Sequence, residues 1–322
     1  MLLSMLSKRT MNLVKWLKLE LKHFTVDLQE RVCLHLEFKD YDIIEIDLDT
    51  NGNSDDFGML TSDVIVVRLI AEGEVEDDIH VDWEYPNMRD WIDHLQYIFS
   101  YNYVDLSFFE LRTLCYSFES IVKTLEGTPI RILQAADKYD VFRRVLHYFP
   151  TPRLLNLLGR VLPVSHPAPC SKFMAKLLIQ NFNALYFYSS IPITLNSLLI
   201  MNAPFLRACA PTLSDRELNM YVRLWMNNTA SKLEYLDLDY DSFDPDEHRP
   251  FRIFDKDVIL KGINYIERPI DLKRVFQFSI DFHSFGLCVG LYGGYDVTRQ
   301  DGTTCSVFIR TERPLIKLVV WP

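Results

Sequence analysis

The chain has 322 residues, of which 48% are hydrophobic, and its 34 basic and 44 acidic residues give a formal charge of −10. So high an apolar fraction excludes an intrinsically disordered tail. A folded chain of this length buries roughly 75% of its unfolded surface, which is enough for a large core without disulfide or metal cross-links. The acidic balance argues against a nucleic-acid phosphate backbone as the main partner, because that affinity comes from lysine and arginine.

The charge is spread unevenly along the chain. Residues 1–23 carry a net charge of +4, residues 24–100 carry −16, and residues 101–322 carry +2. Such steps in composition are boundary signals. We therefore predict three segments, with boundaries near residues 23 and 100.

The N-terminal third begins with a predicted helix and continues with predicted strands. Apolar residues at helical spacing predict a short helix over residues 2–17. Apolar residues then alternate with polar ones over residues 32–38 and 44–48, which predicts two strands. The runs 64–69 and 79–83 predict two further strands. The acidic residues alternate with the apolar ones, so a solvent-facing strand surface accounts for most of the −16 charge. Residues 24–100 are thus predicted to form an acidic, β-rich unit.

From about residue 100 a weak repeat appears. Six sites show an apolar residue, two intervening residues and a second apolar residue, at a mean spacing of about 26 residues. The second positions are Leu106, Leu133, Leu157, Leu185, Leu206 and Leu236. This period lies in the range of leucine-rich repeats, and it predicts stacked strand–turn–helix units that cover each other's apolar faces. An ordinary α/β domain with accidental spacing is the alternative.

Helix signals fill the gaps between these sites, and strand signals follow them. Residues 141–149 are amphipathic, Thr194 can cap a helix over residues 195–201, and Ser214 with Glu217 forms a capping box for a helix that continues through Trp225. Strand-like runs follow at 275–282, 286–292, 305–311 and 315–321, with glycine turns at 293–294 and 301–302. The predicted fold class is α/β (α+β), with degenerate leucine-rich-repeat-like units between a β-rich N-terminal unit and a C-terminal antiparallel segment.

Two features bear on the cellular compartment. Residues 177–206 hold no charge, but prolines and asparagines interrupt them, so we interpret them as buried core rather than a membrane span. The six cysteines form no C-x-x-C pair, and no convincing signal peptide precedes them. We expect reduced thiols in the cytoplasm or nucleus.

One loop resembles a calcium site in its spacing. Asp47, Asp49, Asn51 and Asp55 stand where such a loop places its oxygen ligands. The bidentate glutamate expected at the last position is replaced by Gly58, and the preceding segment is a predicted strand. An acidic hairpin loop is the favoured interpretation, and a calcium-binding β module is retained as an alternative.

No other chemistry emerges from the residues. The acidic stretch that begins at Asp237 and Asp239 is interpreted as a solvated strand end and loop. The histidines show no metal-ligand spacing, and the chain contains neither a nucleophile elbow nor a phosphate loop. Residues 101–232 carry a net charge of +6 without any recognised nucleic-acid motif. We therefore predict no catalytic residue, no cofactor, no nucleic acid and no membrane partner.

Three motifs carry a resemblance to a known family. They are residues 194–202; residues 213–225 followed by 233–236; and residues 293–303 followed by the strand ending at Trp321. In this order they resemble the nematode F-box proteins that carry the type 2 F-box-associated domain, and the resemblance covers about residues 24–322. The motif residues are expected to be structural: Ser214, Glu217, Trp225, Leu233, Leu236, Asp296, Arg299, Asp301, Gly302 and Trp321. Among them, Trp225 and Trp321 are expected to fill core, and Asp296 is expected to pair with Arg299.

The N-terminal helix resembles the last helix of an F-box, with Leu3, Leu6, Leu13 and Val14 as the possible adaptor-docking remnant. In the family, the complete module docks the adaptor subunit of SCF-type ubiquitin ligases. The resemblance therefore implies a non-enzymatic substrate-recognition subunit that holds a protein target. The earlier F-box helices do not precede this segment, so two expectations stand: the sequence is a truncated form of a longer chain, or it is a stand-alone binding module without adaptor docking.

Overall fold

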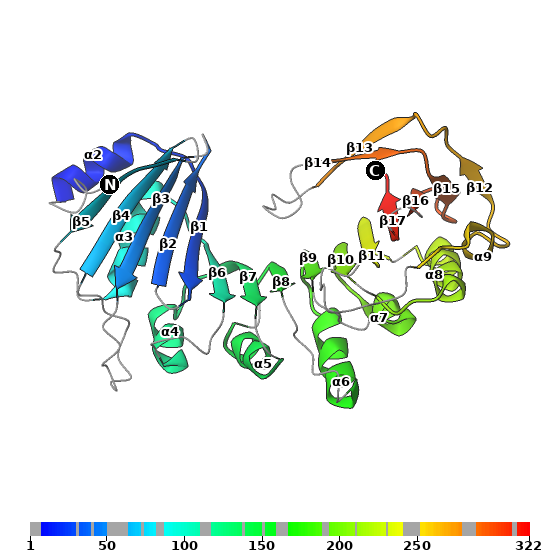
Figure 1. Ribbon diagram of the computed structural model, residues 1–322, viewed down its shortest axis with the longest axis horizontal. Coiled ribbons are helices and arrows are strands. Elements are labelled where there is room, and N and C mark those ends of the chain that lie inside the picture. The colour runs from blue at the N-terminus through cyan, green and yellow to red at the C-terminus, as the bar shows by residue number, and fades with distance from the viewer. Residues whose placement is uncertain are drawn as a thin grey trace. The chain divides into compact units, whose positions relative to one another are not determined.

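A computed structural model describes most of the chain and resolves it into two compact units. The described residues are 8–29, 32–39, 42–49, 64–71, 74–81, 87–109, 117–136, 139–149, 152–158, 167–188, 193–209, 211–229, 231–240, 252–278, 288–310 and 314–322. Unit 1 spans Met1–Pro152 and unit 2 spans Arg153–Pro322 (Figure 1).

Unit 1 is built on one mixed sheet with the strand order β7-β6-β1-β2-β3-β4-β5. Its strands are β1 (Leu21–Leu28), β2 (Val32–Phe38), β3 (Ile43–Asp49), β4 (Val64–Ala71), β5 (Glu74–Val81), β6 (Val104–Phe109) and β7 (Ile130–Ala136). Strands β1 to β5 form an antiparallel meander, whereas β6 runs parallel to both β1 and β7. In β2 the apolar residues are buried and the alternating polar ones are half-buried, as the period of two predicts.

Four helices accompany this sheet in the described part of unit 1. They are α2 (Lys8–Trp16), α3 (Met88–Phe99), α4 (Phe118–Thr124) and α5 (Tyr139–Tyr148). The predicted helices at 2–17 and 141–149 correspond to α2 and α5. The sequence analysis predicts neither α3 nor β1. Helix α3 lies in the segment that is predicted to be β-rich, and no individual strand is predicted at the residues of β1. In strand β1 the apolar Phe24, Val26 and Leu28 alternate with Thr25 and Asp27, so the strand signal is present in the sequence but was missed.

In unit 2, four parallel strands alternate with helices. The strands are β8 (Leu154–Leu158), β9 (Ala184–Phe187), β10 (Phe205–Cys209) and β11 (Tyr235–Asp239), and the helices between them are α6 (Pro167–Leu178), α7 (Leu195–Ile200) and α8 (Asp215–Asn227). Figure 1 shows α6, α7 and α8 on one side of this strand row. Each helix is thus the crossover of a strand–helix–strand unit.

The strand register tests the predicted repeat positions. Leu185, Leu206 and Leu236 are aligned across β9, β10 and β11, and Leu106 is aligned with Leu133 in unit 1. At β8 the aligned residue is Leu155, not the predicted Leu157. The error of two residues follows from the period of a strand, because Leu155 and Leu157 point to the same face and the pattern cannot separate them.

The C-terminal part of unit 2 extends the same sheet with antiparallel strands. Strand β17 (Leu315–Val320) pairs with β11, followed by β16 (Thr304–Arg310), β15 (Tyr295–Thr298) and the edge strand β12 (Tyr265–Glu267). A separate hairpin joins β13 (Lys273–Gln277) to β14 (Cys288–Tyr292), and a short helix, α9 (Lys256–Ile259), precedes β12. The two predicted glycine turns are confirmed, since Gly293, Gly294 and Gly302 all have positive φ.

The α/β (α+β) fold class is confirmed. Strand pairing between β1 and β6 joins residues on both sides of the boundary predicted near residue 100, and the division between compact units lies after Pro152. The boundaries near 23 and 100, and the relation to leucine-rich repeats, stay predictions.

In the described structure no helix is both long and apolar enough to cross a bilayer. The uncharged stretch 177–206 is divided among several elements. It comprises the end of α6, strand β9, helix α7 and the start of β10. The interpretation as buried core is correct for the strands but wrong for Ile179, Leu199 and Ile200, which are 57%, 46% and 40% exposed. The sequence could not show this, because burial of a short helix depends on what packs against it.

Gly294 offers a test of the C-terminal sheet. Its φ is +98°, and an added Cβ lies only 2.8 Å from two ring atoms of Phe308. We expect Gly294→Ala to lower the free energy of unfolding by about 2–4 kcal/mol, since a positive φ and an overpacked contact both destabilise. Gly302→Ala is the matched control, because Gly302 has a φ of +89° with no atom within 4 Å. Urea unfolding of both variants measures the difference, and equal losses would show that the Phe308 contact has no effect.

Candidate functional site

Unit 2 contains a partly open cavity between α7 and α8, which we call the α7–α8 cavity. Its volume is about 480 Å³, within the range of ligand-binding pockets. The residues that line it come from α7 and α8 and from the loops that follow α6, α7 and α8. They are Ile179, Leu198, Leu199, Ile200, Met201, Asn202, Tyr221, Leu224, Trp225, Asn228, Ser231, Lys232 and Leu233.

Capping interactions fix where the two helices of the cavity begin. Thr194 accepts a hydrogen bond from the backbone N–H of Ser197 at 3.2 Å, which starts α7. The predicted capping box of α8 is confirmed: the Glu217 carboxylate accepts from the backbone N–H of Ser214 at 2.8 Å, and Ser214 Oγ accepts from the N–H of Glu217 at 3.3 Å. Satisfying these N-terminal donors makes both short helices stable enough to hold the cavity walls.

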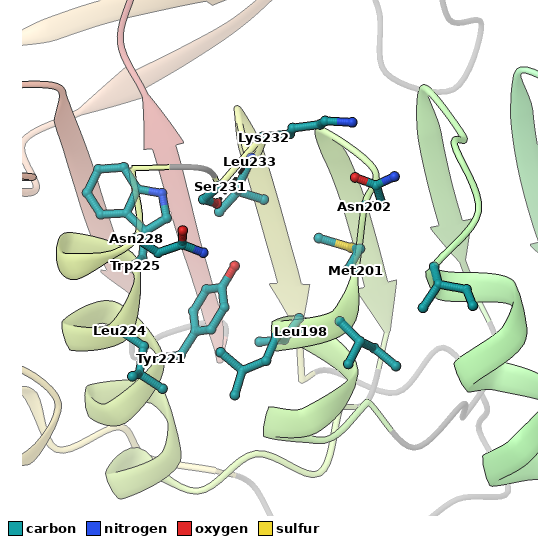
Figure 2. A pocket seen from close by; sticks show the side chains of 13 residues that line it. Leu198, Met201, Asn202, Tyr221, Leu224, Trp225, Asn228, Ser231, Lys232 and Leu233 are labelled. Atoms are coloured by element: carbon teal, nitrogen blue, oxygen red, sulfur yellow. Dashed lines mark hydrogen bonds between the residues drawn. The ribbon is translucent and has the colours of Figure 1, made fainter. Parts of the chain in front are cut away.

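Both sides of the cavity combine large apolar side chains with polar groups. Figure 2 shows Trp225 and Asn228 on the α8 side, Met201 and Asn202 on the α7 side, and the Tyr221 hydroxyl pointing into the space between them. Burial raises the pKa of the Tyr221 hydroxyl, so this group stays protonated. The lining is therefore mainly apolar, with a few uncharged polar groups and one charged side chain, that of Lys232.

Trp225 is the most deeply buried polar group of the lining. Its side chain is 2% exposed, and within the described part of the chain no acceptor lies within hydrogen-bond distance of Nε1. In Figure 2 this nitrogen lies on the edge of the indole that faces the cavity. A buried N–H without an acceptor costs about 1–3 kcal/mol, and a ligand oxygen that reached this donor would offset that cost.

Apolar side chains continue from the cavity onto the surface. Leu224 is 41% exposed, and it adds to the exposed Ile179, Leu199 and Ile200 described above. All four line the α7–α8 cavity. Grouping of exposed aliphatic side chains around a hollow is typical of protein-binding surfaces, whereas single exposed apolar residues are common everywhere.

The turn between β15 and β16 supports the α8 wall. The guanidinium of Arg299 lies 5.1 Å from the Trp225 ring, and its Nη1 donates to the carbonyls of Asn228 and Ser231 at 3.4 Å each. A cation at the C-terminal end of a helix also interacts favourably with the helix dipole. Arg299 therefore holds Trp225 and the residues after α8 in place.

The segment that forms the α7–α8 cavity is also the part of the chain that matches a known family. Residues 174–238 match the F-box associated family model. No curated protein and no solved structure matches the chain. All residues that line the α7–α8 cavity lie inside the F-box-associated segment, as we call residues 174–238.

The residues that were predicted from family motifs fall into three places. Trp225 and Leu233 line the cavity, and Arg299 supports it together with Asp301, whose carboxylate accepts from Arg299 Nε at 3.0 Å. That guanidinium and the Thr303 N–H lower the pKa of Asp301. The Gly302 N–H donates to the Arg299 carbonyl at 3.0 Å and closes the turn.

The remaining motif residues lie away from the cavity. Ser214 and Glu217 begin α8 at its opposite end, and Leu236 is fully buried in the sheet of the F-box-associated segment. Trp225 fills core as predicted. Trp321 is only half-buried, and its indole nitrogen donates to Ser306 Oγ at 2.6 Å.

The predicted pair of Asp296 with Arg299 is wrong. Asp296 lies on β15 and forms ion pairs with Arg268 at 2.6 Å and Arg274 at 3.0 Å, and it also accepts from the Ser306 hydroxyl. Burial alone raises the pKa of Asp296, but these hydrogen bonds outweigh it and the pKa lies below its ordinary value. Arg299 follows the strand in the turn, where its own partner is Asp301.

The interpretation of the acidic residues of β11 is also wrong. The aspartates Asp237 and Asp239 of β11 were expected to be solvated, but they are 1% and 0% exposed. The Asp237 carboxylate accepts from Lys317 Nζ at 3.0 Å and lies 3.5 Å from Arg207 Nε. Its neighbours come from β10 and β17, which pair with β11 from distant parts of the sequence. Aromatic contacts of Phe276 with Phe205 and Tyr235 cover the same face.

The calcium candidates are only partly described. The Asp47 carboxylate pairs with Arg68 and is thereby already neutralised. Asp49 ends β3, and Asn51 and Asp55 lie outside the described residues. Among the residues that the structure describes, no group of three or more metal-ligating side chains is found.

The adaptor-docking candidates lie at the N-terminus. Leu3 and Leu6 are outside the described residues, and Leu13 belongs to α2. Val14 is buried, and α2 contacts α3 through a hydrogen bond of 3.3 Å between Tyr97 and Asn12. Among the side chains that the structure describes there, Trp16 in α2 and Leu17 in the following turn are exposed, at 83% and 67%.

Asp296 gives a pH prediction. Because its folded pKa is lowered, its stabilising contribution is complete above the unfolded value of about 3.9 and is lost as the pH falls through the folded value. We expect Asp296→Asn to lower the free energy of unfolding at pH 7 by about 2–3 kcal/mol, less than for a fully buried pair because Arg268 is partly exposed. The difference in free energy of unfolding between this variant and the wild type should become smaller between pH 4 and pH 2, as measured by urea unfolding. The exposed Asp271→Asn is the charge-matched control, and a difference that does not change with pH would contradict the assignment.

Proposed function

We propose that the chain is a non-enzymatic protein-interaction protein that holds a protein target for an SCF-type ubiquitin ligase in the cytoplasm or nucleus. One observation carries the proposal: the residues that line the α7–α8 cavity, from Ile179 to Leu233, all lie inside the F-box-associated segment. The segment that relates the chain to F-box proteins is thus also the segment that forms its cavity.

The character of the surface supports a protein target. The rim of the cavity exposes several aliphatic side chains, and a buried indole donor and a buried tyrosine hydroxyl lie inside. Tryptophan and tyrosine in desolvated pockets, surrounded by apolar contacts, are typical of the residues that dominate protein–protein binding energy. The thiols of Cys33, Cys288 and Cys305 form no disulfide, which is consistent with a reducing compartment.

A stand-alone binding module without adaptor docking is the second candidate. Burial of Val14 favours it, because a side chain packed within unit 1 is not available to an adaptor. Exposure of Trp16 and Leu17 favours the ligase role, since both present apolar surface next to the helix that resembles an F-box helix. The two candidates differ in one measurable property, which is association with the adaptor.

Co-purification tests the ligase role. We expect the tagged full chain, co-expressed with the SCF adaptor and cullin, to retain the adaptor, and Trp16→Ala with Leu17→Asp to release it because the exposed apolar contact is lost. Ile270→Glu, a change at a residue that is 88% exposed in unit 2, is the control and should retain the adaptor. Absence of adaptor from the wild-type purification would reject the ligase role and leave the stand-alone module.

Target binding is tested separately at the cavity rim. Leu199→Glu and Leu224→Glu each place a carboxylate in the apolar rim, and we expect each to deplete the proteins that co-purify with the wild-type chain. Both residues are more than one-third exposed, so the fold should tolerate the change. Quantitative mass spectrometry against Ile270→Glu measures the depletion. The same set of proteins with all three variants would show that the rim does not hold the target.

A further inference from the structure

We infer that the α7–α8 cavity binds a short acidic peptide segment, with an aliphatic side chain inside the cavity and a carboxylate beside Lys232. The inference rests on the proposed function, because it states which kind of target segment the cavity takes. It is argued from the apolar lining, the buried Trp225 donor and the charge at the rim.

The interior of the cavity fits an aliphatic side chain. Leu198, Met201 and Leu233 line it, and Leu198 and Leu233 are buried. Burying one leucine-sized side chain stabilises a complex by about 1.5–3 kcal/mol. A volume of about 480 Å³ leaves room for such a side chain together with part of the peptide backbone.

The Trp225 indole N–H requires an acceptor. Among the described residues none is within hydrogen-bond distance, although the side chain is 98% removed from solvent. The indole nitrogen can only donate, so a ligand has to present an oxygen to it. A backbone carbonyl next to an inserted side chain is such an oxygen, and every peptide carries one.

The charge at the rim selects for an acidic segment. Lys232 is exposed and is the one charged side chain among the described residues that line the cavity, so no lining carboxylate neutralises it. Figure 2 shows Lys232 and Asn202 at the same end of the cavity. A negative side chain near this end gains an ion pair, whereas a positive one is repelled.

The exposed rim favours a peptide over a small anionic molecule such as a fatty acid. Ile179, Leu199, Ile200 and Leu224 all keep at least 40% of their surface exposed. A small ligand inside the cavity leaves these rim side chains in water. A peptide that continues across the rim covers them, which adds apolar burial on both sides of the inserted residue.

Selection from a random dodecapeptide library on phage, with the full chain as bait, tests the inference. We expect the enriched sequences to place an aliphatic residue within three positions of Asp or Glu. Synthetic versions of these peptides should bind in fluorescence polarisation and weaken about five- to tenfold with Lys232→Glu. Lys232→Arg should restore binding, and higher salt should weaken it.

Arg223→Glu is the matched control for Lys232→Glu. Arg223 is exposed on helix α8, before the loop that holds Lys232, and does not line the cavity, so the same change of charge should leave peptide affinity unchanged. An equal loss of peptide affinity in the two variants would show that net charge alone causes the effect, and it would overturn the inference. Enriched sequences without an acidic residue, or no enrichment, would also overturn it.

The indole N–H signal of Trp225 provides a direct readout. The five tryptophans give separate indole signals in a ¹⁵N-correlated NMR spectrum, and the signal missing from Trp225→Phe identifies this residue. We expect the enriched peptide to shift that signal, and a shift confined to other tryptophans would place the peptide elsewhere. Because this assay uses neither adaptor nor cullin, peptide binding without adaptor association would reject only the ligase role. Adaptor association without peptide binding would reject only the inference.

Discussion

The parallel register of β9, β10 and β11 is the constraint on which the candidate site depends. Leu185, Leu206 and Leu236 are aligned across these strands, so every crossover helix returns to the same height along the sheet. Helices α7 and α8 therefore contact each other, and the C-terminal parts of both line the cavity. A shift of one residue in β10 would turn the buried Leu206 to the opposite face, where Arg207 now lies, and would separate the walls of the cavity.

Basic side chains from the C-terminal part of unit 2 neutralise the carboxylates that its sheet buries. Asp237 is neutralised by Lys317, which comes from β17, and Asp296 is neutralised by two arginines from the segment before β14. Both carboxylates are buried on strands, where an unpaired charge is costly. The C-terminal strands thus contribute pairing, charge neutralisation and, through Arg299, direct support of the Trp225 wall.

Local features of this fold could be predicted from the sequence, and tertiary ones could not. The capping box of Ser214 and Glu217 was correct because it involves residues three positions apart in one helix. The pairing of Asp296 with Arg299 was wrong because Asp296 lies on β15 beside Arg268 and Arg274, two arginines distant in the sequence, whereas Arg299 lies in the turn after the strand. The exposure of Leu199 and the burial of Asp237 depend on which distant elements pack nearby, and the local pattern carries no information about that. The cavity itself joins two helices and the loops after α6, α7 and α8, so no single motif predicts it, although Trp225 and Leu233 were already among the motif residues.

Strand β17 pairs with a strand of the recognised segment but lies outside the family match. The family match ends at residue 238, within β11, and β17 lies about eighty residues further along the chain. In the complete unit, β17 occupies the whole outer edge of β11 from Tyr235 to Asp239. A fragment cut at the end of the match would leave that edge unpaired, with its backbone N–H and C=O groups open to another chain. The recognised segment is therefore completed by a C-terminal strand that lies outside the family match.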